Sequence, residues 1–324
     1  MKVVFAEMPE AEGRDLSIER RQLPADARVE TFTYRGDREA LAAACRDADA
    51  ILTDYVPFDR GQLERLERCR IISVAATGWD CVDVAEAATR GIRVAAVGEY
   101  CTEEVADHTL ALILALERRL FDYHRQVQEA HDWRWNAVTG IRRIAGATLG
   151  LVGFGRIGQA VARRARGFGL AVIASDPRME ASAAAREGVE PVGFDELLAR
   201  ADILSLHCNL DASNRGLVGR AAFAKMRRRP RLVNVARGGL VVEADLVEAL
   251  DAGQISGAAL DVLAEDSPDL GHHPLVGRRD VILTPHVAFY SEAALDDLRR
   301  ISAANITAFL EGRPQDVFRL VPAP

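Results

Sequence analysis

A glycine-rich turn is the first stretch of this 324-residue chain whose residue types and spacing indicate a chemical role. The stretch "TLGLVGFGRIGQAVARRARGFGLAVIASD" places Gly153, Gly155 and Gly158 between a predicted strand and a predicted helix. Glycines in this pattern allow a tight turn, a close approach of backbone to a pyrophosphate, and close helix–strand packing. The N–H groups at the helix start, at Arg156 and Ile157, are expected to face the pyrophosphate. The pattern predicts a dinucleotide site.

Asp176 ends the second strand of this unit, 18 residues beyond Gly158. A carboxylate at that point accepts a hydrogen bond from a ribose 2′-OH and repels a 2′-phosphate. The sequence therefore favours NAD over NADP, although Arg178 close by weakens the preference.

A lone histidine, His286, lies in "TPHVAFYSE" after the apolar residues Val281, Ile282 and Leu283. Position alone favours a packed core histidine. An acid–base role requires a cofactor, a cation and a carboxylate directed at the same place. Both interpretations stay open at this point.

The elements that would position these residues alternate between short β-branched runs and helical patterns, which is typical of βαβ units and parallel sheets. Strands are expected at 3–6, 29–33, 50–53, 71–75, 94–97, 148–153, 171–175, 203–207, 232–235, 257–260 and 281–284. Long helices are expected at 102–120, 156–168 and 291–310, with shorter ones near 180–187, 195–200 and 243–251. We predict an α/β protein with two Rossmann-like domains. A nucleotide-binding domain (102–291) would be inserted into a smaller, flavodoxin-like substrate domain (1–101 and 292–324).

Composition narrows the class of protein further. A formal net charge of −7 argues against a broad nucleic-acid-binding face. Five cysteines without C-x-x-C spacing indicate reduced thiols in a cytoplasmic compartment, with neither a disulfide framework nor a zinc site. The longest apolar run, "LALILAL" at 110–116, is too short to span a membrane, and the N-terminal apolar run is too short for a signal peptide.

The segment 131–146, "HDWRWNAVTGIRRIAG", has no clear period and holds two of the three tryptophans. It is either a surface loop or an arm that packs on a partner subunit. We favour the arm, because two indole side chains in a polar segment need a place to bury.

Several ordered blocks resemble the D-isomer-specific 2-hydroxyacid dehydrogenase family over nearly the whole chain. They include "ATGWDCVDVAEAATRGIRVAAV" (76–97), "TEEVADHTLALILAL" (102–116), "LVNVARGGLV" (232–241), "GAALDV" (257–262) and "ILTPHVAFYSE" (282–292). Within the family, "SLHCNLDASNRGL" (205–217) is most similar to the branch that contains the C-terminal-binding proteins and their bacterial dehydrogenase relatives.

The resemblance implies a role for each matching position. Arg237 would be the catalytic arginine and His286 the catalytic histidine, and the backbone of Ala76, Thr77 and Gly78 would bind the substrate carboxylate. Cofactor contacts are implied at Thr77, Cys208, Asn209, Val235, Ala236, Arg237, Asp261 and His286. These roles suit the chemistry, because the planar guanidinium can hold a 2-oxo acid while a histidine donates the proton.

The acidic partner of His286 is the position where the chain departs from the family. The family places a glutamate five residues after the aspartate of "ALDV", where this chain has Asp266, with Glu265 just before it. We favour Asp266; Glu265 would serve if the loop register shifted by one residue, and both could instead be solvated acids.

We therefore expect a homodimeric, NAD-dependent oxidoreductase that interconverts a small D-2-hydroxy acid and its 2-oxo acid. The alternative is an NAD(H)-sensing, corepressor-like interaction protein with little catalysis. Candidate specificity residues are Trp79, Tyr100, Phe289 and Tyr290.

Overall fold

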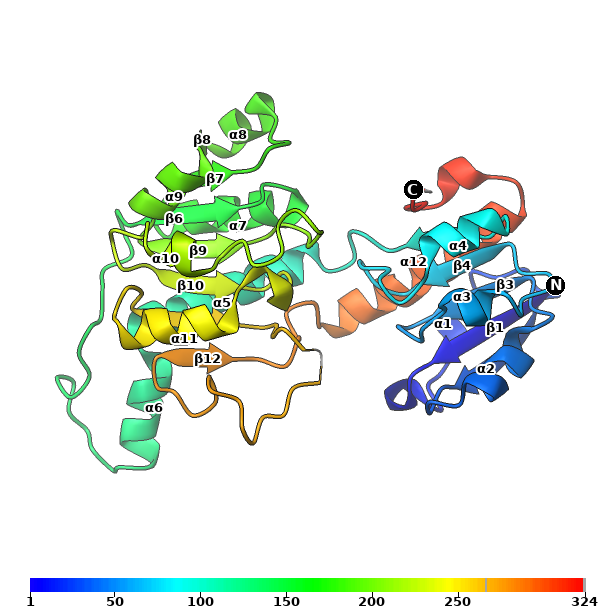
Figure 1. The fold of residues 1–324 in the computed structure, drawn as a ribbon, viewed down its shortest axis with the longest axis horizontal. Helices are drawn as coiled ribbons and strands as arrows, with labels where there is room; N and C mark the ends of the chain where they lie inside the picture. Colours follow the sequence, from blue (N-terminus) through cyan, green and yellow to red (C-terminus); the bar gives the residue numbers. More distant parts are fainter. Residues whose placement is uncertain (266, 323–324) are drawn as a thin grey trace. The chain divides into compact units, whose positions relative to one another are not determined.

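The structure is a computed structural model that describes residues 1–265 and 267–322, and it divides into two compact units (Figure 1). Unit 1 comprises Met1–Cys101 and Ser291–Pro324, and unit 2 comprises Thr102–Tyr290. The chain leaves unit 1 once and returns to it once, so unit 2 is an insertion between two parts of unit 1.

Unit 1 is built on a five-stranded parallel sheet with the order β2-β1-β3-β4-β5. This 2-1-3-4-5 order is that of flavodoxin-like folds, as the sequence predicted. The strands are β1 (Lys2–Glu7), β2 (Arg28–Thr33), β3 (Ala50–Thr53), β4 (Ile71–Val74) and β5 (Arg93–Ala96). The helices are α1 (Ser17–Arg20), α2 (Arg38–Cys45), α3 (Arg60–Leu63), α4 (Val84–Thr89) and α12 (Glu292–Leu310), with single turns η1 (Pro9–Ala11) and η3 (Pro314–Asp316).

Alternate residues of these strands enter two separate apolar cores. Val3 and Phe5 pack with Ile306 of α12 on one face of the sheet. Val4 and Ala6 belong to the core on the other face, which also contains residues of α2, α3 and α4. Because successive strand residues point to opposite faces, a strand buried on both sides must be apolar throughout, which explains the continuous run in β1.

Unit 2 has a seven-stranded parallel sheet with the order β12-β11-β10-β9-β6-β7-β8. Six of these strands follow the 3-2-1-4-5-6 order of dinucleotide-binding sheets, and the order reverses between β6 and β9. The strands are β6 (Thr148–Val152), β7 (Ala171–Ser175), β8 (Glu190–Pro191), β9 (Ile203–Leu206), β10 (Arg231–Asn234), β11 (Gly257–Leu260) and β12 (Val281–Leu283). The helices are α5 (Thr102–Arg118), α6 (Leu120–Gln128), α7 (Arg156–Gly167), α8 (Ala181–Glu187), α9 (Phe194–Arg200), α10 (Arg220–Phe223) and α11 (Glu243–Asp251), with one turn η2 (Gly238–Leu240).

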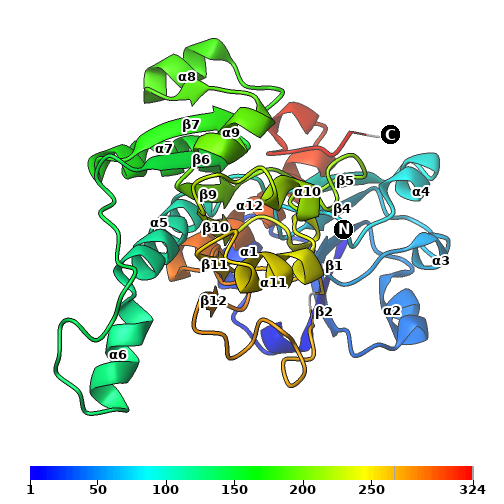
Figure 2. The same cartoon turned by 60° about the vertical axis from the view of Figure 1, so that its left-hand side comes forward.

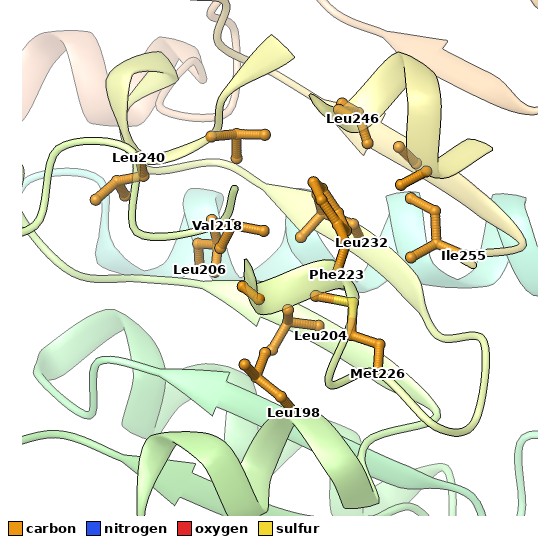
Figure 3. Close-up of a cluster of buried hydrophobic side chains, with 14 of the residues drawn as sticks. Leu198, Leu204, Leu206, Val218, Phe223, Met226, Leu232, Leu240, Leu246 and Ile255 are labelled. Atoms are coloured by element: carbon orange, nitrogen blue, oxygen red, sulfur yellow. The ribbon is translucent and has the colours of Figure 1, made fainter. Parts of the chain in front are cut away.

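The main core of unit 2 joins the middle strands to the helices that cover them (Figure 3). Leu204 and Leu232 extend from neighbouring strands toward Phe223 of α10, and all three side chains are at most 1% exposed. This core anchors β9 and β10 rigidly, and the loops at their carboxyl ends carry the candidate site.

The helix expected at 102–120 is confirmed as α5 (Thr102–Arg118). Arg119 then adopts a left-handed conformation (φ 54°), and a second helix, α6, begins at Leu120. The second helix, α6, was not predicted, and it projects from the body of unit 2 together with the segment that follows it (Figure 2). Trp133 and Trp135 in that segment are 88% and 85% exposed. None of the helices in the described part of the chain is long and apolar enough to cross a membrane.

Candidate active site

The glycine-rich turn after β6 lies against the end of β9. Gly153 has φ +94°, and a Cβ atom on it would be 2.7 Å from the backbone nitrogen of Cys208. A Cβ atom on Gly158 would be 2.5 Å from the carbonyl oxygen of Gly153. Side chains at either position would push β6 away from β9 or from α7, so the first and third glycines set the packing of the turn.

Gly155 differs from the other two because a Cβ atom there would meet no other atom within 4 Å. It is the extended N-cap residue of α7, and the first intrahelical bond runs from the N–H of Gln159 to its carbonyl oxygen. The N–H groups of Arg156, Ile157 and Gly158 precede that bond, so they have no acceptor within the helix. Open space beside a helix N-terminus fits the pyrophosphate of a dinucleotide.

Asp176, just beyond β7, accepts backbone hydrogen bonds that hold the glycine-rich turn in place. One carboxylate oxygen accepts from the N–H of Phe154 and the other from the N–H of Arg178, both at 2.8 Å. The Arg178 guanidinium donates to the side-chain oxygen of Asn209 at 3.2 Å. Asp176 thus fixes the glycine turn in addition to the ribose contact that the sequence predicted, and the lone pairs that remain on its oxygens suit a 2′-OH.

His207 and Cys208 follow β9 beside the glycine turn. The Nε2 atom of His207 lies 2.8 Å from the Ser205 hydroxyl, and its Nδ1 atom is buried without a hydrogen-bond partner among the described residues. Burial lowers the pKa of His207 to about 3, so its ring is neutral at physiological pH. Burial also raises the pKa of the Cys208 thiol. Cys208 packs against the apolar core of unit 2, and the burial of His207 beside Ser205 suits a structural role for this histidine.

Arg237 lies in the turn after β10, and Asn234 holds this turn at both ends. The Asn234 side chain accepts from the N–H of Ala236 at 3.1 Å and donates to the carbonyl oxygen of Arg237 at 2.9 Å. Asn234 is completely buried, and Val235 is 8% exposed. The Arg237 guanidinium donates to the carbonyl of Ala236 at 2.8 Å and forms no ion pair with any carboxylate in the described ranges. A half-buried arginine without a carboxylate partner is a fitting receptor for a substrate carboxylate.

A second loop packs on this turn. A Cβ atom on Gly238 would lie 1.7 Å from the carbonyl oxygen of Leu263, so only glycine allows the approach. The next N–H of the loop, that of Ala264, donates to a carboxylate oxygen of Glu243 at 2.7 Å. The other Glu243 oxygen is 3.3 Å from Nε2 of His273. Sequence reasoning gave no role to either residue, and together they hold the start of the loop that contains Glu265.

His286 lies after β12 with a left-handed backbone (φ 52°), which is uncommon for a non-glycine residue and is often found at functional sites. Its N–H donates to the carbonyl oxygen of Asp261 at 2.8 Å. Its ring is exposed and lies edge-on to Phe289, with 6.1 Å between the ring centroids. The imidazole is therefore presented outward from the carboxyl edge of the sheet.

The buried carboxylate of Asp261 organises this turn. Its Oδ1 atom accepts from the Thr284 hydroxyl at 2.5 Å and from the N–H of Val287 at 2.9 Å. Its Oδ2 atom accepts from the N–H of Ala288 at 2.9 Å. Asp261 was predicted as a cofactor contact, and the structure adds a second role, because the same carboxylate shapes the turn that carries His286. His108 of α5, which sequence reasoning missed, joins the same network through Thr284, at 3.2 Å from its hydroxyl.

Among the described residues, no carboxylate forms a hydrogen bond or an ion pair with the His286 ring. Glu265 is exposed and forms neither a hydrogen bond nor an ion pair with His286. Asp266, the partner favoured from the sequence, lies outside the described residues. The assignment of Asp266 stays a prediction.

In unit 1, Ala76, Thr77 and Gly78 form a bend at the carboxyl end of β4. The carbonyl oxygen of Ala76 accepts from the N–H of Val97 at 2.9 Å, which fixes the bend. Within the described chain, the N–H groups of residues 76–78 have no acceptor. Three consecutive unpaired N–H donors are an anion-binding arrangement, as the predicted role in carboxylate binding requires.

Among the residues that the structure describes, no group of three or more His, Cys, Asp or Glu side chains is placed to hold a metal ion. The strand order of unit 2, the glycine turn and Asp176 define a dinucleotide-binding domain of the Rossmann type.

Known proteins match the chain over most of its length. Residues 110–288 match the model of the family "D-isomer specific 2-hydroxyacid dehydrogenase, NAD binding domain". A hydroxypyruvate reductase of Blautia hydrogenotrophica is 34% identical over 87% of this chain and 88% of its own. A glycerate dehydrogenase of Methylorubrum extorquens is 33% identical over 98% of both chains.

Solved structures agree with these matches. A D-lactate dehydrogenase from Aquifex aeolicus, complexed with NAD and lactic acid, superposes with a TM-score of 0.86 at 26% identity, covering 99% of both chains. The apo-structure of D-lactate dehydrogenase from Escherichia coli gives 0.82 at 28% identity, covering 96% of this chain and 98% of that one. The chain belongs to the D-isomer-specific 2-hydroxyacid dehydrogenase family and is an NAD-dependent enzyme.

Proposed function

We propose that this enzyme interconverts a small D-2-hydroxy acid and its 2-oxo acid, with hydroxypyruvate and D-glycerate as the first pair to test. The observation that carries the proposal is the pairing of an arginine without a carboxylate partner, Arg237, with an outward-facing histidine, His286, on the unit that holds the dinucleotide site. Two relatives that match most of the chain are named for this pair of acids.

NAD, when bound, supplies the hydride acceptor or donor. Gly155 leaves room for its pyrophosphate, Gly153 and Gly158 hold the turn in its packed position, and Asp176 provides the ribose acceptor. Arg237 then binds the substrate carboxylate and polarises the carbonyl through its second N–H edge. His286 donates a proton to the oxygen of the 2-oxo acid in reduction and removes it in oxidation.

Unit 1 is proposed as the substrate domain. The unpaired N–H groups of Ala76, Thr77 and Gly78 would bind the substrate carboxylate, and Thr77 would also touch the cofactor. Trp79, next in sequence, is held in place by the guanidinium of Arg319, 4.5 Å from the ring centroid. A small polar acid suits backbone donors of this kind.

The proposal is tested by following NADH absorbance with purified enzyme and a panel of 2-oxo acids that contains hydroxypyruvate, glyoxylate, pyruvate and branched 2-oxo acids. We expect turnover with at least one of them, and fastest with hydroxypyruvate. NADH binding without turnover of any member would contradict the proposal and favour the NAD(H)-sensing alternative. NADPH in parallel assays tests the preference that Asp176 predicts.

We further propose that the active form is a cytoplasmic homodimer joined through α5, α6 and the 131–146 arm. Trp133, Trp135, Leu120 and Phe121 are all about half exposed or more within unit 2, which is more apolar surface than one projecting segment normally leaves in water. All five cysteines are free thiols, which suits a reducing compartment. Light scattering on wild type and Phe121→Asp tests the dimer, and a monomeric wild type would overturn this proposal.

A further inference from the structure

The 284–288 turn, which carries His286, has a hydrogen-bond partner far away in sequence. His108 lies in the second turn of α5, and its Nε2 atom is 3.2 Å from the hydroxyl of Thr284 and 3.6 Å from Oδ1 of Asp261. Its side chain is 23% exposed, whereas Asp261 has none of its side chain exposed. α5, the first helix of unit 2, thus contacts the 284–288 turn, which lies near the end of the same unit.

The direction of these hydrogen bonds follows from the number of protons available. Thr284 has one hydroxyl proton, and the 2.5 Å contact to Asp261 Oδ1 uses it. At its contact with His108, Thr284 can therefore only accept. The Nε2 atom of His108 must carry a proton and donate it, which defines the tautomer of the neutral ring.

This donation orients the Thr284 hydroxyl. With one of its lone pairs engaged by His108, the hydroxyl hydrogen stays directed at Asp261. Without that donor the hydroxyl can rotate, and the buried carboxylate loses one of its three donors. Since the other two donors are the N–H groups of Val287 and Ala288, a shift of Asp261 moves the backbone that directly follows His286.

Two acidic residues of the same part of α5 pair with another helix. Glu103 and Asp107 both bind Arg164 of α7, with Asp107 at 2.6 Å from its Nε atom. Asp261 is the carboxylate that faces His108 within ion-pair distance among the described residues.

We propose that His108 is a positioning residue for His286 and acts through Thr284 and Asp261. The proposal rests on the proposed function, because it assigns His286 to proton transfer. His108 itself neither touches the substrate in the proposed mechanism nor belongs to the 284–288 turn.

The first test compares two replacements of His108. The amide of His108→Gln can place an N–H close to the original Nε2 position, whereas His108→Leu fills similar space without a donor. We expect His108→Leu to lower kcat for 2-oxo acid reduction about tenfold with little change in NADH affinity, and His108→Gln to recover most of that loss. His272→Leu, an exposed histidine of the same unit, serves as the control and should leave kcat unchanged.

A double-mutant cycle with Thr284→Val tests the route of the effect. Because both residues act on one carboxylate, His108→Leu combined with Thr284→Val should be no slower than Thr284→Val alone. Equal losses for His108→Leu and His108→Gln, or fully additive effects in the cycle, would overturn the proposal.

An NMR measurement keeps the inference separate from the activity assay. The Nε2–H of His108 should give an exchange-protected imidazole signal in wild type, and Thr284→Val should remove its protection. If no 2-oxo acid is turned over but this signal behaves as expected, only the proposed function fails. If turnover is found and the signal is missing, the assignment of His108 fails.

Discussion

Gly238 and Leu263 approach so closely that a Cβ atom on the glycine would lie 1.7 Å from the carbonyl oxygen of the leucine. The contact joins the turn after β10, which carries Arg237, to the loop after β11, which leads to Glu265. These two loops carry candidate catalytic groups, and they can pack this closely only because residue 238 has no side chain.

Replacing Gly238 with alanine should separate these loops. The overlap is with backbone, which cannot rotate away, so Arg237 or the loop after Leu263 must move by more than an ångström. We expect kcat/KM for the best 2-oxo acid to fall about a hundredfold, measured by steady-state NADH oxidation. Gly193→Ala is the matched control, since a Cβ atom there meets nothing within 4 Å. Wild-type kinetics for Gly238→Ala would show that the loops are not coupled in this way.

Replacing Arg237 with lysine keeps the charge and removes the planar bidentate donor. The ammonium group of lysine can contact one carboxylate oxygen but cannot hold the carboxylate and the carbonyl together. We expect kcat/KM to drop at least about a hundredfold while NADH affinity, followed by fluorescence titration, changes far less. Arg220→Lys, at an exposed arginine that binds Glu248, provides the control. If the kcat/KM of Arg237→Lys were close to that of wild type, a bidentate role for Arg237 would be excluded.

Much of the architecture was predictable from the chain alone. All eleven strand predictions lie within about one residue of the observed ends, because most of these strands are short apolar runs bounded by turns, and parallel strands buried on both faces leave that pattern. The glycine turn and Asp176 were also recognisable, since they are close in sequence and each has a backbone reason for its residue type.

The parts that were not predicted depend on contacts between distant residues. The pairing of His108 with Thr284 spans 176 positions, and no local pattern marks it. The link from Glu243 to Ala264 spans 21 residues and depends on where α11 begins. α6 was not predicted; it begins directly after Arg119, whose left-handed backbone ends α5. Such features depend on the tertiary fold.

Replacing His286 should slow the reduction of the 2-oxo acid without weakening the binding of NADH. The residue has φ 52°, a conformation that asparagine tolerates better than glutamine, so both His286→Gln and His286→Asn are informative. We expect both variants to lose reduction by about 10²- to 10⁴-fold, because the proton donor is gone, and to retain nearly wild-type NADH affinity. The measurement pairs steady-state rates with NADH fluorescence titration. A fully active variant would exclude His286 as the proton donor.

The last prediction concerns the stability of unit 1 as pH changes. Asp54 follows β3, accepts from the N–H of Met8 at 2.8 Å, and has Arg14 at 3.8 Å. Glu7 lies 3.7 Å from the same arginine, so Arg14 faces two carboxylates at once, whereas Glu19, also 3.7 Å from Arg14, is bound by Arg299 at 2.8 Å. Burial raises the pKa of Asp54 to about 6, and burial also raises the pKa of Glu7.

A raised carboxyl pKa means that the folded protein keeps a proton that the unfolded chain has lost. The contribution of Asp54 to stability should therefore fall as pH rises from about 4 to about 6, and the full cost of its buried charge should remain above that range. Asp54→Asn removes the charge and keeps an oxygen for the Met8 N–H. We expect the variant to be more stable than wild type by about 1–2 kcal/mol at pH 8, with a smaller difference at pH 5. Urea unfolding at both pH values measures this, with the exposed Asp26→Asn as the control. A variant less stable than wild type at pH 8 would show that the Asp54 carboxylate is stabilised by Arg14 more than burial destabilises it.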